Sequence, residues 1–139
     1  MIRACPHCGS RNRVPSRHLA SEGRCGACKQ ALPPLSEPVE VEAQAFDDIV
    51  REAKVPVLVD FWAAWCQPCQ AAAPEVARAA ANLAGRAIVL KVNTETQPQL
   101  ANRYNVRSIP NFAVFRDGAL HTQQAGLIGD RALVKLALG

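Results

Sequence analysis

Residues 56–69 read PVLVDFWAAWCQPC, and this stretch decides the fold. Its first half, Pro56–Trp62, is almost entirely apolar and, with proline at its start, too short for a helix, so it predicts a buried central strand. Its second half places Cys66 and Cys69 at the start of an Ala-rich segment that we expect to be helical as far as Leu83. A strand followed directly by a helix that opens with Cys-x-x-Cys favours a dithiol redox site.

The helix start has a chemical consequence for the two thiols. Unpaired N–H groups and the helix dipole stabilise a thiolate there, and the thiolate is the form that attacks disulfides. We expect Cys66 to lie at the helix mouth as the nucleophile. Cys69 follows one turn further in, less exposed, as the resolving thiol, and Pro68 is compatible with the first helical turn. The alternative is half of a metal site, or two buried cysteines without chemistry.

Two residues outside this pair join the predicted site. Asp60 lies within the apolar strand, where burial is costly and raises the pKa of a carboxyl group towards the range of a general acid or base. We expect it beneath the cysteines, able to take a proton from Cys69, with Lys91 as its charge partner; the alternative is a surface-facing Asp on an edge strand. Pro110 directly precedes another predicted strand, and its peptide bond could be cis or an ordinary trans bond.

The pattern around this stretch alternates strands and helices. Apolar periodicity and the Asp117–Gly118 hairpin signal predict strands at 39–41, 87–92, 111–115 and 120–125 and helices at 43–53, 97–104 and 129–138. Strands that alternate with helices in the first part of this pattern require parallel crossover connections, and the hairpin near the end of the chain adds antiparallel strands. The fold class is therefore α/β, with a mixed central sheet flanked by helices.

Composition limits the compartment and the class of protein. Hydrophobic residues make up 49% and charged residues 20% of the 139 residues, as in an ordinary globular protein. The start of the chain has no apolar core of a signal peptide, and no run is long enough to span a membrane. We therefore expect a cytoplasmic protein, and we expect it to be a monomer. Structural disulfides are rare in the cytoplasm, so the six cysteines need another explanation.

The first quarter of the chain differs from the remainder. Residues 1–35 carry six basic residues and one acidic residue, a net charge of +5, whereas residues 36–139 carry ten and eleven, a net charge of −1. Residues 1–35 lack helical or strand periodicity, and prolines 33, 34 and 38 predict a stiff extended connector. We divide the chain into a four-cysteine module with its connector, 1–35, and a second domain, 36–139.

The module has the spacing of a structural zinc site. Its cysteines form two Cys-x-x-Cys knuckles, Cys5/Cys8 and Cys25/Cys28, separated by sixteen residues. Four thiolates suit tetrahedral zinc and leave no open position, and the metal would supply the folding energy of so short a segment. Disulfides or free thiols are the alternatives. His7 and His18 are expected to face solvent. Nucleic-acid binding is disfavoured because residues 1–35 contain no aromatic side chain for base stacking.

Residues 39–139 resemble the thioredoxin family throughout. The resemblance rests on VLVDFWA at 57–63, WCQPC at 65–69, Ala73-Pro74, KVN at 91–93, VRSIP at 106–110, the Phe115-x-Asp117-Gly118 turn and Gly126. The four-cysteine segment before such a domain is similar to the zinc-binding bacterial thioredoxins, of the thioredoxin 2 type.

The resemblance implies a thioredoxin fold and protein-disulfide reductase activity in redox homeostasis and the oxidative stress response. It implies that Cys66 attacks, Cys69 resolves, Asp60 assists and Pro110 is cis beside the disulfide. It further implies that Ile109 pairs with an extended target peptide, and that Trp65, Ile109 and Gly126 form the apolar rim that docks oxidised protein substrates, beside Gln67 and Pro68. Thioredoxin reductase, using NADPH, would re-reduce the disulfide. Structural Zn²⁺, one ion, is the expected cofactor, with no organic cofactor, membrane or nucleic-acid partner.

The sequence departs from the family pattern at three positions near the cysteines. Gln67 replaces glycine, Gln70 replaces a basic residue, and Asn111 replaces threonine after Pro110. These changes affect redox potential and partner choice. An alternative function is a redox sensor or chaperone-like binder, in which oxidation of the four module cysteines releases zinc; another is an oxidase or isomerase.

Overall fold

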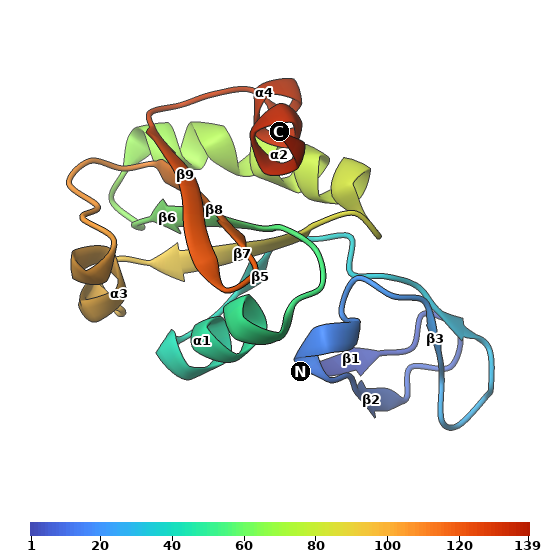
Figure 1. Ribbon diagram of the computed structural model, residues 1–139. Coiled ribbons are helices and arrows are strands. Elements are labelled where there is room, and N and C mark those ends of the chain that lie inside the picture. Colours follow the sequence, from blue (N-terminus) through green and yellow to red (C-terminus); the bar gives the residue numbers. More distant parts are fainter.

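A five-stranded mixed sheet forms the centre of the computed structural model, which describes residues 1–139 (Figure 1). The strand order is β5-β7-β6-β8-β9, so the strand of the opening stretch, β6, lies in the middle. It pairs in parallel with β7 and antiparallel with β8. The strands are β5 (Val39–Glu40), β6 (Val57–Trp62), β7 (Ile88–Asn93), β8 (Asn111–Arg116) and β9 (Ala119–Ala125). The predicted mixed sheet is confirmed.

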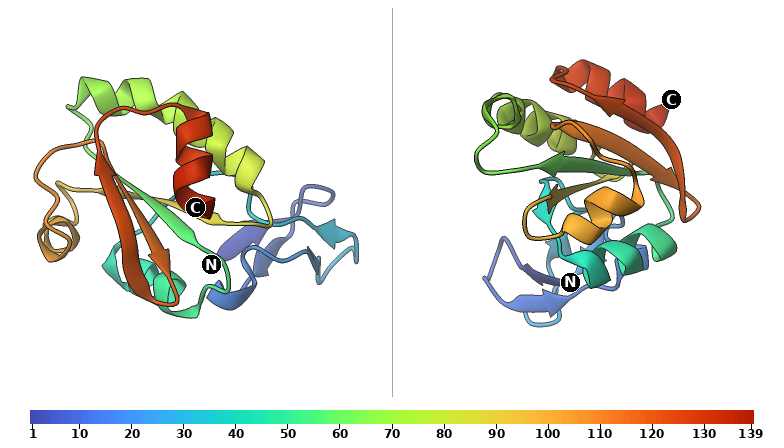
Figure 2. Two further views of the ribbon diagram at one scale, coloured as in Figure 1. Left: turned by 45° about the horizontal axis from the view of Figure 1, so that its top comes forward. Right: turned by 90° about the vertical axis from the view of Figure 1, so that its left-hand side faces the viewer.

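Helices cover both faces of the sheet, as Figures 1 and 2 show. One face packs against α1 and the other against α2 and α4, because side chains alternate along β6: Val57, Val59 and Phe61 join the first core cluster and Leu58 the second. α3 adds Leu100 to the first cluster. The helices are α1 (Ala43–Glu52), α2 (Gln67–Leu83), α3 (Pro98–Arg103) and α4 (Asp130–Leu138).

The N-terminal module contains regular structure that the sequence did not predict. Two short antiparallel hairpins, β1 (Ile2–Ala4) with β2 (Arg11–Arg13) and β3 (Gly23–Arg24) with β4 (Ala31–Leu32), flank a 3-10 helix, η1 (Ser16–His18). Strands of two or three residues are too short to show a periodic apolar pattern, which explains why the sequence analysis missed them.

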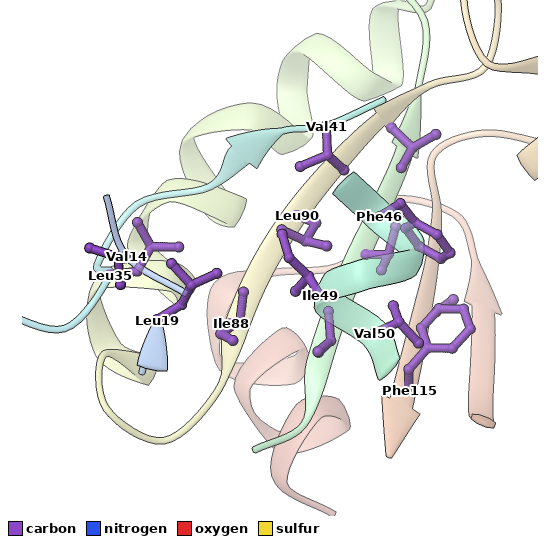
Figure 3. Close-up of a cluster of buried hydrophobic side chains, with 14 of the residues drawn as sticks. Val14, Leu19, Leu35, Val41, Phe46, Ile49, Val50, Ile88, Leu90 and Phe115 are labelled. Atoms are coloured by element: carbon purple, nitrogen blue, oxygen red, sulfur yellow. The ribbon is translucent and has the colours of Figure 1, made fainter. Parts of the chain in front are cut away.

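The module packs against the domain through apolar side chains. Leu19 and Leu35 are 0% and 5% exposed and belong to the same core cluster as Ile49 and Ile88 (Figure 3). The Leu35 N–H also donates to the Leu19 carbonyl at 2.9 Å. The proline-rich segment is therefore held against the core at Leu35.

The N-terminal module lies far from the start of α2. It sits beside α1 and the C-terminal end of α2, whereas the N-terminal end of α2 points away from it (Figures 1 and 2). A Cβ added at Gly85, just after α2, would lie 3.9 Å from both Ala20 and Pro34.

None of the helices combines the length and the apolar character that a membrane span requires.

Candidate active site and four-cysteine cluster

Cys66 and Cys69 form a disulfide at the N-terminus of α2. Cys66 is the N-cap residue, with extended backbone (φ −86°, ψ 109°), and its Sγ accepts a hydrogen bond from the Cys69 N–H at 3.2 Å. Pro68 occupies the first turn, where it removes no helical hydrogen bond. The same N–H group that would be left unpaired at the helix start therefore donates to the sulfur, which favours negative charge on Cys66.

Exposure does not distinguish the two sulfur-bearing residues in this disulfide form. Cys66 is 3% and Cys69 4% exposed, so the expectation that Cys69 is the less exposed of the two is wrong. The bond holds the two residues side by side, with Cα atoms 5.2 Å apart. The two cysteines differ instead in their access to a surface groove, because Cys66 lines this groove and Cys69 does not.

This redox groove has a volume of about 480 Å³ and opens on Cys66. The loop before Pro110 forms its other wall, and the Ile109 carbonyl oxygen lies 3.7 Å from the Cys66 Sγ. Four of the five residues expected to bind substrate lie in the groove: Trp65, Gln67, Pro68 and Ile109. Thr94, Val106, Arg107 and Ser108 also line it and were not predicted, although three of them directly precede Ile109 in the sequence.

Gly126 is exposed and lies next to Pro110. It does not line the groove; its N–H donates to the Pro110 carbonyl at 2.8 Å, with a backbone φ of +101° that favours glycine. The Ile109–Pro110 peptide bond is cis, as the resemblance implied. Gly126 therefore supports the cis-proline loop, and its expected place in the apolar rim that docks substrates stays a prediction.

Asp60 is a buried carboxyl group with a raised pKa. It is 2% exposed on the central strand, so the alternative of a surface-facing Asp on an edge strand is wrong. Burial raises its pKa to about 7; the charge of Lys91 lowers it and that of Glu40 raises it. One carboxyl oxygen, Oδ1, has no hydrogen-bond partner. A group with this pKa can exchange a proton near neutral pH.

Lys91 acts on Asp60 through its charge, which lowers the Asp60 pKa, without a direct ion pair. The two residues are register partners in β6 and β7, but the Lys91 ammonium lies over the Trp62 ring, 4.6 Å from its centre. Glu40 accepts hydrogen bonds from Trp62 Nε1 at 2.9 Å and from the Asn93 N–H at 3.0 Å. Glu40 was not predicted as part of this environment, because a lone Glu on an edge strand carries no sequence signal.

The residues that depart from the family pattern make local hydrogen bonds. Gln70 Nε2 donates to the Ala64 carbonyl at 3.2 Å, in the loop that precedes Cys66. Asn111 is 6% exposed and its Oδ1 accepts from Gln123 Nε2 at 2.9 Å. Gln123 also donates to the Tyr104 carbonyl at 3.1 Å, so Asn111 connects the start of β8 to the end of α3.

The four remaining cysteines form a compact cluster in the module. Their Sγ atoms all lie within 4.8 Å of one another, with Cys5 to Cys28 at 3.7 Å and Cys8 to Cys25 at 3.6 Å. Sulfurs bound to a tetrahedral metal at about 2.3 Å are about 3.8 Å apart, so the spacing fits zinc. All four thiols are free, and His7 and His18 are exposed and outside the cluster.

The two knuckles have the same backbone form. In each, the first sulfur accepts an N–H bond at 3.4 Å, from His7 to Cys5 and from Ala27 to Cys25. The residue after each knuckle has a left-handed φ, +77° at Gly9 and +66° at Lys29. The second knuckle thus uses a lysine where the first uses glycine, and Gly26 within it needs no positive φ.

Asn12 connects the knuckles and was not predicted. Its Oδ1 accepts from the Gly26 N–H at 2.9 Å, and its Nδ2 donates to the Ser10 carbonyl at 3.1 Å and to Cys25 Sγ at 3.6 Å. N–H donors from Cys28, Ala27 and Asn12 lower the pKa of Cys25 to about 6. A thiol that ionises near neutral pH is a ready metal ligand.

Both parts of the chain match known families. A family model described as Thioredoxin matches residues 37–137, and one described as Thioredoxin 2, N-terminal, a zinc ribbon, matches residues 4–30. Thioredoxin C-3 of Corynebacterium nephridii is 43% identical over 114 residues, covering 82% of this chain and 77% of that protein. Thioredoxin 1 of Chlorobaculum tepidum is 45% identical over 86 residues, covering 62% and 85%.

A solved structure supports the same assignment. A mutant thioredoxin from Halobacterium salinarum NRC-1 has a TM-score of 0.67 at 35% identity, covering 73% of this chain and 88% of that chain. With the family match over most of the chain and the Cys66–Cys69 disulfide at the start of α2, this chain belongs to the thioredoxin family and is a protein-disulfide reductase.

Proposed function

We propose that Cys66 is the attacking thiolate of this reductase and Cys69 the resolving thiol. Cys66 Sγ attacks one sulfur of the substrate disulfide, which forms a mixed disulfide and expels the other substrate sulfur as a thiolate. Cys69 Sγ then attacks Cys66, which forms the Cys66–Cys69 disulfide and releases the second substrate thiolate. Two electrons pass from the enzyme to the substrate, and the substrate thiolates take up two protons.

One observation carries this division of roles: Cys66 lines the redox groove and Cys69 does not. A substrate disulfide entering the groove therefore meets Cys66 first. The Cys69 N–H bond to Cys66 Sγ adds to the assignment, because a donor at the helix start stabilises a thiolate.

Asp60 is proposed to accept the Cys69 proton before the resolving attack, directly or through a water molecule. A carboxyl group with a pKa of about 7 and an unpartnered oxygen suits that role. Trp65, Gln67, Pro68 and Ile109 are proposed to contact the substrate, with Ile109 pairing to its backbone. Pro110 is proposed to shape the wall beside the disulfide, and Gly126 to hold Pro110 and to form part of the apolar rim that docks substrate.

The partners of this site follow from its chemistry. Oxidised proteins are the proposed substrates, and an NADPH-dependent thioredoxin reductase is the proposed electron donor that regenerates the dithiol. A reducing compartment, the cytoplasm, is the proposed location, with roles in redox homeostasis and the response to oxidative stress.

The module of residues 1–35 is proposed to hold one structural zinc ion through Cys5, Cys8, Cys25 and Cys28, beside the catalytic domain of residues 36–139. The spacing of the four sulfurs supports this, and the match to a zinc ribbon model agrees with it. A bound ion would neutralise the crowded thiolates and hold the two hairpins together.

The roles of the two catalytic cysteines are tested by trapping. A Cys69→Ser protein incubated with oxidised insulin is expected to accumulate a mixed disulfide at Cys66, read by mass spectrometry of the adduct. The matched Cys66→Ser protein is expected to accumulate none. Adduct on Cys69 in the Cys66→Ser protein, with none on Cys66 in the Cys69→Ser protein, would reverse the assignment.

A further inference from the structure

A second groove lies in the N-terminal module, away from the redox groove. It has a volume of about 340 Å³ and is formed by the two hairpins and η1. Three arginines and one histidine line it, and they come from four separate segments of the module: Arg3, Arg13, His18 and Arg24. We define these four residues as the basic groove.

The arginines of the basic groove form no ion pair within the chain. All ion pairs lie between residues 47 and 130, and none involves residues 1–35. Arg3 and Arg24 donate only to backbone carbonyls, of Pro33 at 2.6 Å and Lys29 at 3.3 Å. Arg13 donates to no side chain or carbonyl, and Glu22 is the one acidic residue in the lining. A concave surface of one sign attracts ligands of the opposite sign.

We propose that the basic groove binds an acidic segment of a partner protein. Carboxylates match the forked guanidinium groups of Arg13 and Arg24, which are free or bonded only to a carbonyl. The lining also includes Val14, Pro15 and Leu32, which gives apolar contacts beside the charges. A peptide presents alternating carboxylates and apolar atoms. A nucleic acid would need base stacking, and residues 1–35 contain no aromatic side chain.

The place of the groove in the molecule allows it to act together with the redox site. The module lies at the C-terminal end of α2 and Cys66 at its N-terminal end, and a helix of 17 residues spans about 25 Å. A partner held by an acidic segment therefore leaves the redox groove open. If the intervening chain spans that distance, its disulfide meets Cys66 at raised effective concentration.

The test is a binding measurement on the full-length, zinc-loaded protein. The probe is a fluorescein-labelled peptide of eight glutamates, followed by anisotropy at low salt. Arg13→Glu/Arg24→Glu is expected to weaken binding by about tenfold or more. The control Arg11→Glu/Arg17→Glu makes the same change in net charge at two exposed positions outside the groove, and is expected to change binding by less than about twofold.

Because Arg24 precedes Cys25, the single variants Arg13→Glu and Arg11→Glu provide a second comparison on one strand, β2, without touching the knuckle. Arg13→Glu is expected to bind the peptide more weakly than Arg11→Glu. Equal losses in both pairs would show that only net charge matters and would overturn the proposal, as would no peptide binding. Tighter binding of an eight-nucleotide oligothymidylate, lost in the same variants, would replace the acidic protein segment by a nucleic acid.

Discussion

The redox pair and the two knuckles share the Cys-x-x-Cys spacing but differ in the sulfur that each cysteine meets. Cys66 and Cys69 are bonded to each other within one helical turn. In the module, sulfurs of one knuckle instead lie beside sulfurs of the other, Cys5 beside Cys28 and Cys8 beside Cys25. The backbone after the motif makes the difference. A helix follows Cys66, whereas a left-handed residue follows each knuckle and turns the chain back.

The comparison shows that spacing alone does not determine cysteine chemistry. An N–H group donates to the first sulfur in all three motifs, from position i+3 at Cys66 and from position i+2 at Cys5 and Cys25. Thiolate stabilisation is therefore common to both kinds of site. Exchange chemistry additionally needs an open groove on one sulfur, and metal binding needs a second pair of sulfurs within reach.

The largest expected effect is on the reduction rate, which distinguishes the Cys66–Cys69 pair from the four-cysteine cluster. Cys66→Ser removes the nucleophile, so the rate of insulin reduction is expected to fall by at least about a thousandfold. Cys8→Ser, in the module, is expected to lose zinc but to keep the rate within about threefold at 25 °C, since the redox groove contains no module residue. A comparable loss of rate in both variants would show that the two sites are not chemically independent.

A pH-dependent stability effect is expected next, in the redox region alone. The folded-state pKa of Asp60, about 7, lies above its unfolded value of about 3.9, so the folded state holds the proton more tightly. The stability that the protonated Asp60 contributes is fully present below about pH 4 and is lost as the pH rises to about 7. Asp60→Asn is therefore expected to stabilise the protein by about 4 kcal/mol at pH 8 and by little at pH 4.

Urea unfolding of both proteins across that pH range gives the difference directly. Asp117→Asn, at an exposed turn, is the matched control and is expected to show no such pH dependence. A stability difference for Asp60→Asn that does not change between pH 4 and pH 8 would contradict the raised pKa. Loss of reduction rate in Asp60→Asn with unchanged affinity for substrate would support the proton-transfer role.

A cavity mutation tests whether the module and the domain unfold as one unit. Leu19 is fully buried in the module but shares the core cluster of α1 and the sheet, so Leu19→Ala is expected to destabilise the whole chain by about 3 kcal/mol. Leu127→Ala, at a 51% exposed position, is expected to change stability by less than about 0.5 kcal/mol. A separate early transition in Leu19→Ala, with the main transition unchanged, would show that the module unfolds independently.

The smallest expected effect concerns Asn12, which joins the two knuckles. Asn12→Ala removes its bonds to Gly26, Ser10 and Cys25, and is expected to lower zinc affinity by about tenfold while leaving the insulin reduction rate unchanged. Competition with a chromophoric chelator measures the affinity. Asn102→Ala, at an exposed position on α3, is the control. Equal affinities in the two variants would show that Asn12 does not support the cluster.

The order of elements in the domain was predictable because its signals are local. The helix expected at 43–53 is α1, Ala43–Glu52, and the strand expected at 56–62 is β6, Val57–Trp62. Apolar periodicity predicts the helix and a short apolar run predicts the strand, so a local stretch of sequence is enough for each. The hairpins of the module were missed, since strands of two or three residues are too short for any periodic signal.

The sequence by itself determined the thioredoxin fold, the three cysteine pairs and the burial of Asp60, because each depends on residues within one strand or one helical turn. Only the tertiary structure decided that Lys91 lies over Trp62, that Glu40 enters the environment of Asp60, that Leu19 and Leu35 join the core, and that arginines from separate segments line one groove. These contacts join residues as far apart in the sequence as Leu19 and Ile88. Their partners are chosen by how the elements pack, a property that no short stretch of sequence carries.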